Sequence, residues 1–230
     1  MCTRGSYVEN QLLVNDTVFL KTMLSNLKKC EELTNATMKC YTSLTKTVTD
    51  NTQSFINAST QCNQRSNSVH SLNNVIRDLS GNDEFMKYNA QVHSETLRCI
   101  ELLINETKAL QKALDNLKSN QKAYESARQK IHKKEAKYSK ANKSLTESST
   151  YRKITEKRDS LKKLTQSKQE EYKAKKENLV KRVSETLSDA YNNYLECTSN
   201  FTMFLGNMMK KNIHVRPPNP FEEAQPAYAL

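Results

Sequence analysis

The residues that most often carry catalysis are scattered along this sequence. Its four histidines lie far apart, with no HExxH pair, no glycine-rich phosphate loop and no clustered carboxylates beside them. Its six cysteines include no CxxC pair, and four of them fall on apolar helical positions, which is typical of reduced cysteines that pack as small hydrophobic side chains. We therefore expect no catalytic residue, no metal site and no cofactor.

Positive charge is concentrated instead of scattered. Residues 108–182 hold 23 Lys and Arg against 9 Asp and Glu, a balance of +14, whereas the rest of the chain balances at −3. The densest part, residues 128–163, holds 13 basic and 4 acidic residues. A solvated helix flank would alternate its charges, because like charges one turn apart destabilise a helix. The run predicts an anionic partner, such as an acidic membrane or a nucleic acid.

An apolar thread runs through this basic stretch at helical spacing and predicts how it is positioned. Its members are Ile131, Tyr138, Leu145, Ile154 and Leu161. The segment TESST at residues 146–150 is rich in residues that cap helices or turn the chain. The thread and the turn together predict a hairpin of two helices whose lysines and arginines point away from the seam.

The remainder of the sequence predicts very long helices. From Leu20 to Leu79, steps of alternately three and four residues meet an apolar side chain at fourteen of eighteen positions, which indicates one sustained heptad seam. Gly81 is suited to end this helix and Asn82 to cap the next, so we expect a tight reversal there. All four prolines lie in the last fourteen residues. These features predict an all-α protein with helices at about 10–80, 83–146 and 150–211, folded as an antiparallel three-helix coiled coil, followed by a disordered tail at 213–230.

A second copy of the chain is the expected partner of this thin structure. Hydrophobic residues make up 36% of the chain and its mean hydropathy is −0.81, which suits helices that share narrow seams. The seams are richest far from the 146–150 turn. The residues with apolar surface to spare there are Tyr191, Tyr194, Phe201, Phe204 and Met209. We expect neither a transmembrane segment nor a secretory signal, because no long apolar run is present.

Two stretches resemble the BAR domain family, the crescent-shaped membrane-binding dimers of amphiphysin and arfaptin. SLNNVIRDLSGNDEFMKYNAQ, at 71–91, resembles the arfaptin-type junction between the first two helices. NLKSNQKAYESARQKIHKKEAKYSKA, at 116–141, resembles the second-helix stretch with a Tyr-x-x-Ala-Arg run, here Tyr124, Ala127 and Arg128. The likeness covers roughly residues 10–212. It implies an elongated, curved homodimer that binds anionic bilayers and senses or generates their curvature, in endocytosis or vesicle trafficking.

The resemblance also implies residues, lipids and a location. The lipids would be phosphatidylserine and phosphoinositides, on the cytoplasmic side of the plasma membrane or of endosomes. Residues 1–10 show no amphipathic helix, which favours scaffolding by a rigid body over wedge insertion. Some arfaptin-like members bind a small GTPase, which is a further candidate partner. The lipid contacts would map to Lys130, Lys133, Lys134, Lys137, Lys140, Lys143, Arg152, Lys153, Lys157, Arg158, Lys162 and Lys163.

The tail carries a separate motif. Asn219, Pro220 and Phe221, followed by two glutamates, resemble the Asn-Pro-Phe ligand of EH domains on endocytic adaptors. The resemblance implies an EH-domain protein as a partner of this segment.

Two other functions compete with membrane binding. A structural coiled-coil scaffold or tether would need no segregated charge. A basic nucleic-acid-binding coiled coil is not expected, because the tyrosines of the basic region, Tyr124, Tyr138 and Tyr172, fall on seams and leave no aromatic platform for bases.

Overall fold

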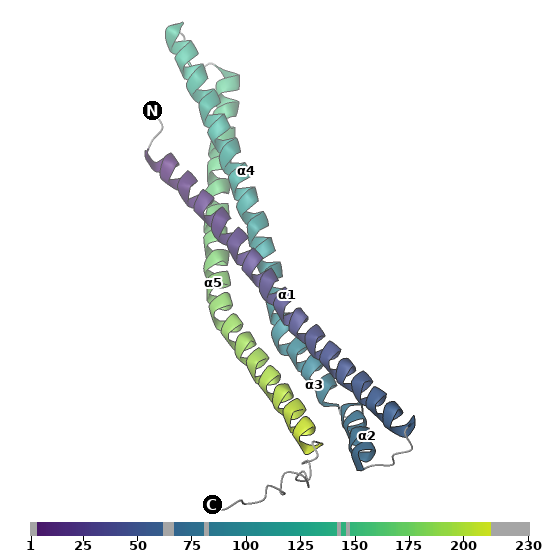
Figure 1. Cartoon of the computed structure of the whole chain (residues 1–230). Coiled ribbons are helices and arrows are strands. Elements are labelled where there is room, and N and C mark those ends of the chain that lie inside the picture. The colour runs from purple at the N-terminus through teal and green to yellow at the C-terminus, as the bar shows by residue number, and fades with distance from the viewer. Residues whose placement is uncertain (1–3, 62–66, 81–82, 142–143, 146–147, 213–230) are drawn as a thin grey trace, which may run out of the picture. The chain divides into compact units, whose positions relative to one another are not determined.

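The computed structural model describes residues 4–61, 67–80, 83–141, 144–145 and 148–212. The regular structure of these residues is entirely helical, which confirms the all-α class (Figure 1). None of the described helices is long and apolar enough to cross a membrane. The elements are α1 (Arg4–Gln61), α2 (Asn67–Ser80), α3 (Glu84–Gln91), the π-helix η1 (Val92–Leu97), α4 (Arg98–Lys140) and α5 (Ser149–Lys211).

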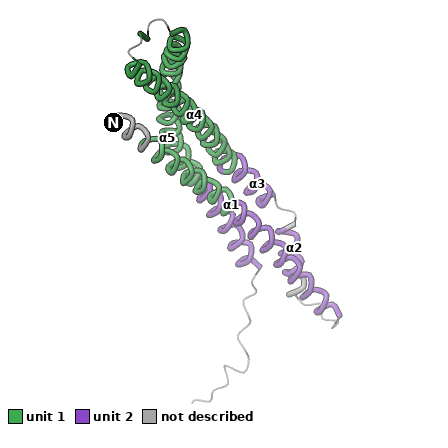
Figure 2. The backbone as a smooth tube through the Cα atoms, turned by 90° about the horizontal axis from the view of Figure 1, so that it is seen from above, with its two compact units in different colours: residues 1–33, 97–191 green, residues 34–96, 192–230 purple. Residues whose placement is uncertain are grey.

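The chain divides into two compact units, and α1 and α5 contribute to both (Figure 2). Unit 1 comprises Met1–Leu33 and Leu97–Tyr191, and unit 2 comprises Thr34–Thr96 and Asn192–Leu230. Each unit has its own buried apolar cluster, so each is described separately.

Unit 1 is built from α1, α4 and α5. Contacts of Thr17 with Lys118 and of Met23 with Thr107 align α1 antiparallel to α4. Its core consists of leucines and a tyrosine at seam positions that the sequence predicted: Leu20, Leu103, Leu110, Leu117, Tyr172 and Leu179. Burying such side chains contributes about 1.5–3 kcal/mol each, which makes this seam the main support of the unit.

The α4–α5 hairpin of unit 1 is much less buried towards its turn. Among the described residues between 118 and 171, only Ala127 and Ile131 are fully buried. The other members of the predicted thread, Tyr138, Leu145, Ile154 and Leu161, are half-buried. The thread therefore forms the expected seam, but a thin one.

The hairpin turn has a defined start to its second helix. α4 ends at Lys140, earlier than the predicted 146, and α5 begins at Ser149, close to the predicted 150. The hydroxyl of Ser148 accepts a hydrogen bond from the backbone N–H of Tyr151 at 3.3 Å, and its carbonyl accepts one from Arg152 at 3.1 Å. Ser148 therefore caps α5, and its hydroxyl satisfies one of the otherwise unpaired donors of the first turn.

Unit 2 has an aromatic core. Tyr88 stacks on Phe201 with ring centroids 4.9 Å apart, and Tyr41 meets both rings edge-on. Tyr194 donates or accepts a hydrogen bond with Thr37 at 2.9 Å. The prediction that Phe201 is spare surface for a second copy is wrong, because its side chain fills the core of its own chain.

The predicted single helix from 10 to 80 is also wrong. α1 ends at Gln61 and α2 begins at Asn67, and Figure 1 shows α2 and α3 running opposite to α1. The chain therefore reverses between α1 and α2, not at Gly81, which lies with Asn82 outside the described residues. The physical reason is local: residues 59–68 (STQCNQRSNS) offer one apolar side chain in ten, too little to sustain a seam.

The heptad phase also slips inside α1. Phe55, on the predicted seam, is 65% exposed, whereas its neighbour Ile56 is 8% exposed. The sheltered positions step from Tyr41 through Thr45, Val48 and Thr52 to Ile56. The heptad spacing therefore holds as far as Thr52, and the next sheltered residue is Ile56, one position beyond the predicted Phe55.

Candidate functional site

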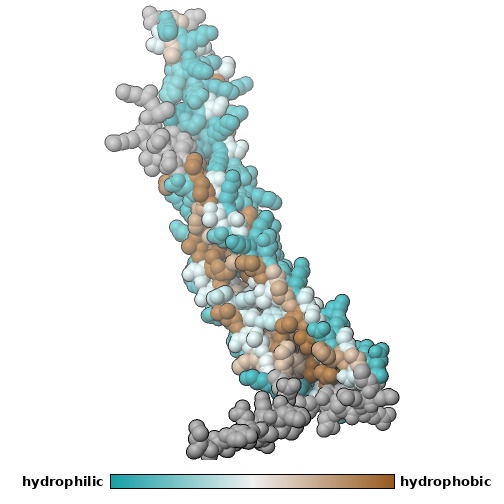
Figure 3. Space-filling model, viewed as in Figure 1, coloured by the Kyte–Doolittle hydropathy of each residue, from teal (hydrophilic) through white to brown (hydrophobic). Residues whose placement is uncertain are grey.

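The candidate site is the basic surface of the α4–α5 hairpin. Figure 3 shows the hairpin end of unit 1 covered mainly by hydrophilic residues on the face in view. Eight of the predicted lysines have exposed side chains that form no ion pair with any described residue: Lys130, Lys133, Lys137, Lys140, Lys153, Lys157, Lys162 and Lys163.

The acidic residues of the hairpin are already engaged. The four described between residues 125 and 159 each pair with a basic neighbour: Glu125 with Arg128 (3.5 Å), Glu135 with His132 (3.3 Å), Glu156 with Arg152 (3.7 Å) and Asp159 with Arg158 (2.7 Å). No described carboxylate in this range is left to compensate the lysines. Their positive field therefore extends into solvent, where it attracts anions.

Four of the lysines form one stripe on α4. At 3.6 residues per turn, Lys130, Lys133, Lys137 and Lys140 fall within an arc of about 80°. The buried residues of this part of α4, Ala127 and Ile131, are on a different face of the helix. A flat or gently curved anionic surface could thus meet all four ammonium groups at once. We call these four residues the α4 lysine stripe.

Lys134 does not belong to the stripe. Its side chain is half-buried, with the ammonium 3.5 Å from the Ser148 hydroxyl and 5.9 Å from the centroid of the Tyr138 ring. Tyr138 also donates a hydrogen bond to Ser148 at 3.2 Å. Lys134 was predicted to contact lipid, and in the structure its side chain contacts the hairpin turn.

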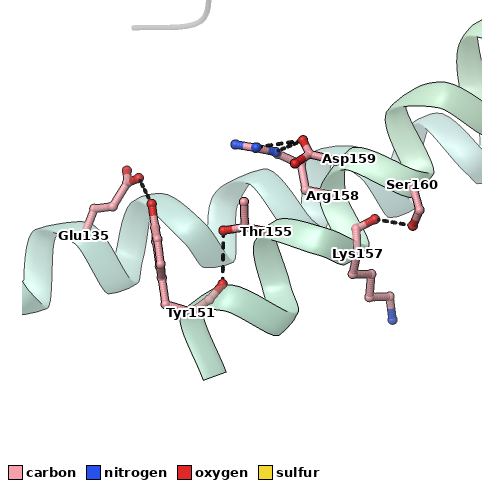
Figure 4. Close-up of polar contacts among 7 residues, drawn as sticks. All are labelled: Glu135, Tyr151, Thr155, Lys157, Arg158, Asp159 and Ser160. Carbon is pink, nitrogen blue, oxygen red and sulfur yellow. Dashed lines mark hydrogen bonds and ion pairs between the residues drawn. The ribbon is translucent and has the colours of Figure 1, made fainter. Parts of the chain in front are cut away.

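A second polar contact joins the two helices of the hairpin. Figure 4 shows Tyr151 of α5 reaching Glu135 of α4, and its hydroxyl donates a hydrogen bond to that carboxylate at 2.8 Å. The hydrogen bond raises the pKa of Tyr151, because losing the proton would place two negative charges side by side. Sequence reasoning missed this pair, since its members are sixteen residues apart and belong to different helices.

The basic residues of α5 are spread around their helix. Lys153 and Lys157 lie about 40° apart, whereas Lys162 lies about 180° from Lys153. Figure 4 shows the Lys157 side chain pointing away from the Arg158–Asp159 pair. The described members of the predicted set therefore do not form one surface: α4 supplies a stripe, and α5 supplies Lys153 and Lys157 on one side and Lys162 on the opposite side.

The remaining predicted site residues lie outside the described residues. These are Lys143 in the hairpin turn, and Asn219, Pro220 and Phe221 in the tail. Within the described part of the chain, no group of three His, Cys, Asp or Glu side chains is arranged to hold a metal ion.

Comparisons with known proteins add no relative. No family model matches the chain, and neither a curated protein nor a solved structure matches it.

Proposed function

We propose that this protein binds anionic lipid bilayers peripherally, as a homodimer, through the α4 lysine stripe with support from the lysines of α5. The observation that carries the proposal is the set of eight exposed lysines without an ionic partner among the described residues. Acidic lipid headgroups, phosphatidylserine and phosphoinositides, supply a surface of fixed negative charge that such lysines would meet.

The magnitudes explain why two copies would be needed. A basic residue near an anionic leaflet contributes about 1 kcal/mol, so one stripe of four supplies about 4 kcal/mol. That corresponds to a dissociation constant of about 1 mM, whereas two stripes acting together approach the micromolar range. A dimer would therefore bind reversibly and without a lipid anchor.

Exposed apolar side chains on α1 of unit 2 support pairing with a second copy. Leu44 and Phe55 are both exposed and lie eleven residues apart, which places them on one face of the helix. The resemblance to BAR domains supports the same conclusion and carries the proposal that the dimer senses or generates curvature. Cytoplasmic faces of the plasma membrane or of endosomes are where such a protein would act.

Vesicle sedimentation tests the proposal. The purified chain is mixed with phosphatidylcholine vesicles, with or without phosphatidylserine, at low salt. Wild type should sediment only with the anionic vesicles. Replacing all four residues of the α4 lysine stripe by Glu should weaken binding at least about 100-fold, since each reversal replaces an attraction with a repulsion. Helical content should be unchanged, because the four side chains are exposed.

A matched control separates the stripe from net charge. Lys21, Lys28, Lys29 and Lys46 are exposed lysines of α1, and reversing them changes the net charge equally. This control variant should still sediment with anionic vesicles. If both variants lose binding alike, the stripe assignment fails. If wild type ignores anionic vesicles but shifts RNA or DNA with a steep salt dependence, the nucleic-acid alternative replaces it.

A further inference from the structure

Unit 1 contains a groove that shares Lys162, but no residue of the α4 lysine stripe, with the proposed lipid surface. It is a cavity of about 840 Å³ between the N-terminal part of α1, the middle of α4 and the first half of α5. Its α5 wall runs from Lys162 to Lys181, which is about 28 Å at 1.5 Å per residue. A volume of this size lies in the range of about 300–1,000 Å³ that is typical of small-molecule sites.

The polarity of the groove changes along its length. Asp16 of α1 accepts a hydrogen bond from Tyr172 at 3.0 Å and pairs with Lys176 at 2.5 Å, so α1 lies beside the middle of this wall. From there to Lys181 the wall carries Tyr172 and Val180 together with the charged Lys173, Glu177 and Lys181, and Leu12, Leu13 and Leu117 of α1 and α4 complete the lining. The other end is lined by Lys162, Thr165, Gln166 and Gln169.

The charges that remain available on the groove are mostly positive. Lys162 and Lys173 are exposed and have no ionic partner among the described residues. Lys176 is neutralised by Asp16, and Lys181 lies 3.9 Å from Glu185. Of the acidic lining residues, Glu125 is paired with Arg128, whereas Glu177 is exposed beside the apolar end.

We infer that this groove binds one single-chain anionic amphiphile, of the class of a long-chain fatty acid or a lysophosphatidate. The apolar tail lies against Leu12, Leu117 and Val180. The anionic head lies at the polar end, where the Lys162 ammonium and the side-chain amides of Gln166 and Gln169 offer donors. The inference does not depend on bilayer binding, because it concerns one molecule in a cavity and uses none of the α4 lysine stripe.

The full chain is titrated with oleate below its micelle concentration, and heat and the ¹³C shift of its carboxylate are recorded. Two α5 positions provide a matched pair, because Val180 in the groove and Leu164 outside it are both 44% exposed. Val180→Asp should weaken oleate binding about tenfold or more, since a charge replaces apolar surface under the tail. Leu164→Asp should leave binding unchanged, and circular dichroism confirms that both variants remain helical.

The head position has its own pair of variants. Lys162→Glu should weaken oleate binding several-fold and shift the carboxylate resonance, whereas Lys153→Glu, outside the groove, should do neither. Lysophosphatidylcholine, whose head carries no net charge, should bind more weakly than oleate.

The results of these titrations either support the oleate site or overturn it. Saturable binding of one oleate per chain that is sensitive to Val180→Asp supports the site. Uptake from solution identifies a free ligand, and uptake only from oleate-doped vesicles identifies a bilayer source. Absence of saturable binding, or equal loss in Val180→Asp and Leu164→Asp, overturns the inference. Loss of vesicle sedimentation in the α4 stripe variant with oleate binding intact separates this site from the proposed membrane surface.

Discussion

The core of unit 2 and the hairpin end of unit 1 use the same kind of secondary structure for different purposes. In unit 2, Tyr88 and Phe201 stack within an aromatic cluster that excludes water. In the hairpin, only Ala127 and Ile131 are fully buried between residues 118 and 171 of the described chain, and polar contacts such as Tyr151–Glu135 join the helices. One helix, α5, serves both regions. Different segments of α5 thus pack into the aromatic core of unit 2 and carry the basic residues of the hairpin.

The largest effect expected from this difference is on stability in unit 2. Phe201→Ala should lower the free energy of unfolding by about 4 kcal/mol, because it removes a ring from a packed cluster. Met203→Ala, on the same helix but exposed, should change it by less than about 0.5 kcal/mol. Urea unfolding followed by circular dichroism measures both. Equal effects would mean that the aromatic cluster is not the support of this unit.

Within unit 1, packing should weaken towards the hairpin turn. Leu114→Ala should cost about 3 kcal/mol, and Ile131→Ala about 2 kcal/mol, since few buried neighbours surround Ile131 and the site collapses or hydrates more easily. The same urea titrations measure the difference. An Ile131→Ala variant as unstable as Leu114→Ala would show that the hairpin is as tightly packed as the three-helix part.

The lysines of α4 and those of α5 should contribute unequally to vesicle binding. Replacing Lys153, Lys157, Lys162 and Lys163 of α5 by Glu should weaken binding to phosphatidylserine vesicles by about tenfold, because only about two of these charges can face the same bilayer at a time. This is less than the loss expected for the α4 lysine stripe. Sedimentation at matched salt compares the variants, and an α5 loss as large as that of α4 would show that both helices lie against the membrane.

Alkaline pH should lower the free energy of unfolding through Tyr172 in the core of unit 1. Burial and the hydrogen bond to Asp16 raise the pKa of Tyr172 above its ordinary value of 10.0, so the folded state favours the neutral phenol. The resulting stability is present below pH 10 and is lost as the pH rises beyond it. Tyr172→Phe should therefore show a shallower alkaline decline of its urea midpoint than wild type. An identical decline in both proteins would contradict this assignment.

The smallest expected effect is on the free energy of unfolding at acid pH, through Glu171 on the exposed face of α5. Ion pairs with Lys168 (2.7 Å) and Lys175 (2.6 Å) lower the pKa of Glu171 to about 2. The stability that Glu171 contributes is fully present above pH 4.5, its ordinary pKa, and is lost as the pH falls from there towards 2. In Glu171→Gln, the free energy of unfolding from urea titrations should therefore fall slightly less between these two pH values than in wild type. Glu170→Gln, whose carboxylate has no described ion pair, serves as the control and should not.

The sequence predicted the seams of unit 1 better than the path of the chain. Leu103, Leu110 and Leu117 recur every seventh residue and are buried as expected, since burial follows directly from apolar periodicity. The reversal after Gln61 was missed because apolar positions resume in phase at Val69. Periodicity cannot tell an unbroken helix from two helices whose spacings agree. The slip at Phe55 was missed because Ile56 beside it is equally apolar, and only packing chooses between them.

For the candidate site, the sequence predicted which residues are charged but not which charges are available. Lys133 and Lys134 are adjacent and identical, yet Lys133 is exposed whereas Lys134 lies over Tyr138 and near Ser148. That distinction depends on the turn between α4 and α5, which brings Ser148 back onto α4. Short-range rules succeed within one helix and fail where the chain returns to an earlier segment.

The sparse burial of the hairpin has a consequence for its backbone amides. Segments with few buried apolar contacts open locally at a lower free energy than the rest of a domain. Deuterium should therefore enter the end of α4 beyond Ile131 and the first turns of α5 sooner than it enters the amides around Leu114. An anionic surface that fastens both helices would slow that entry, so the rate of labelling at this one end reports occupancy without any mutation.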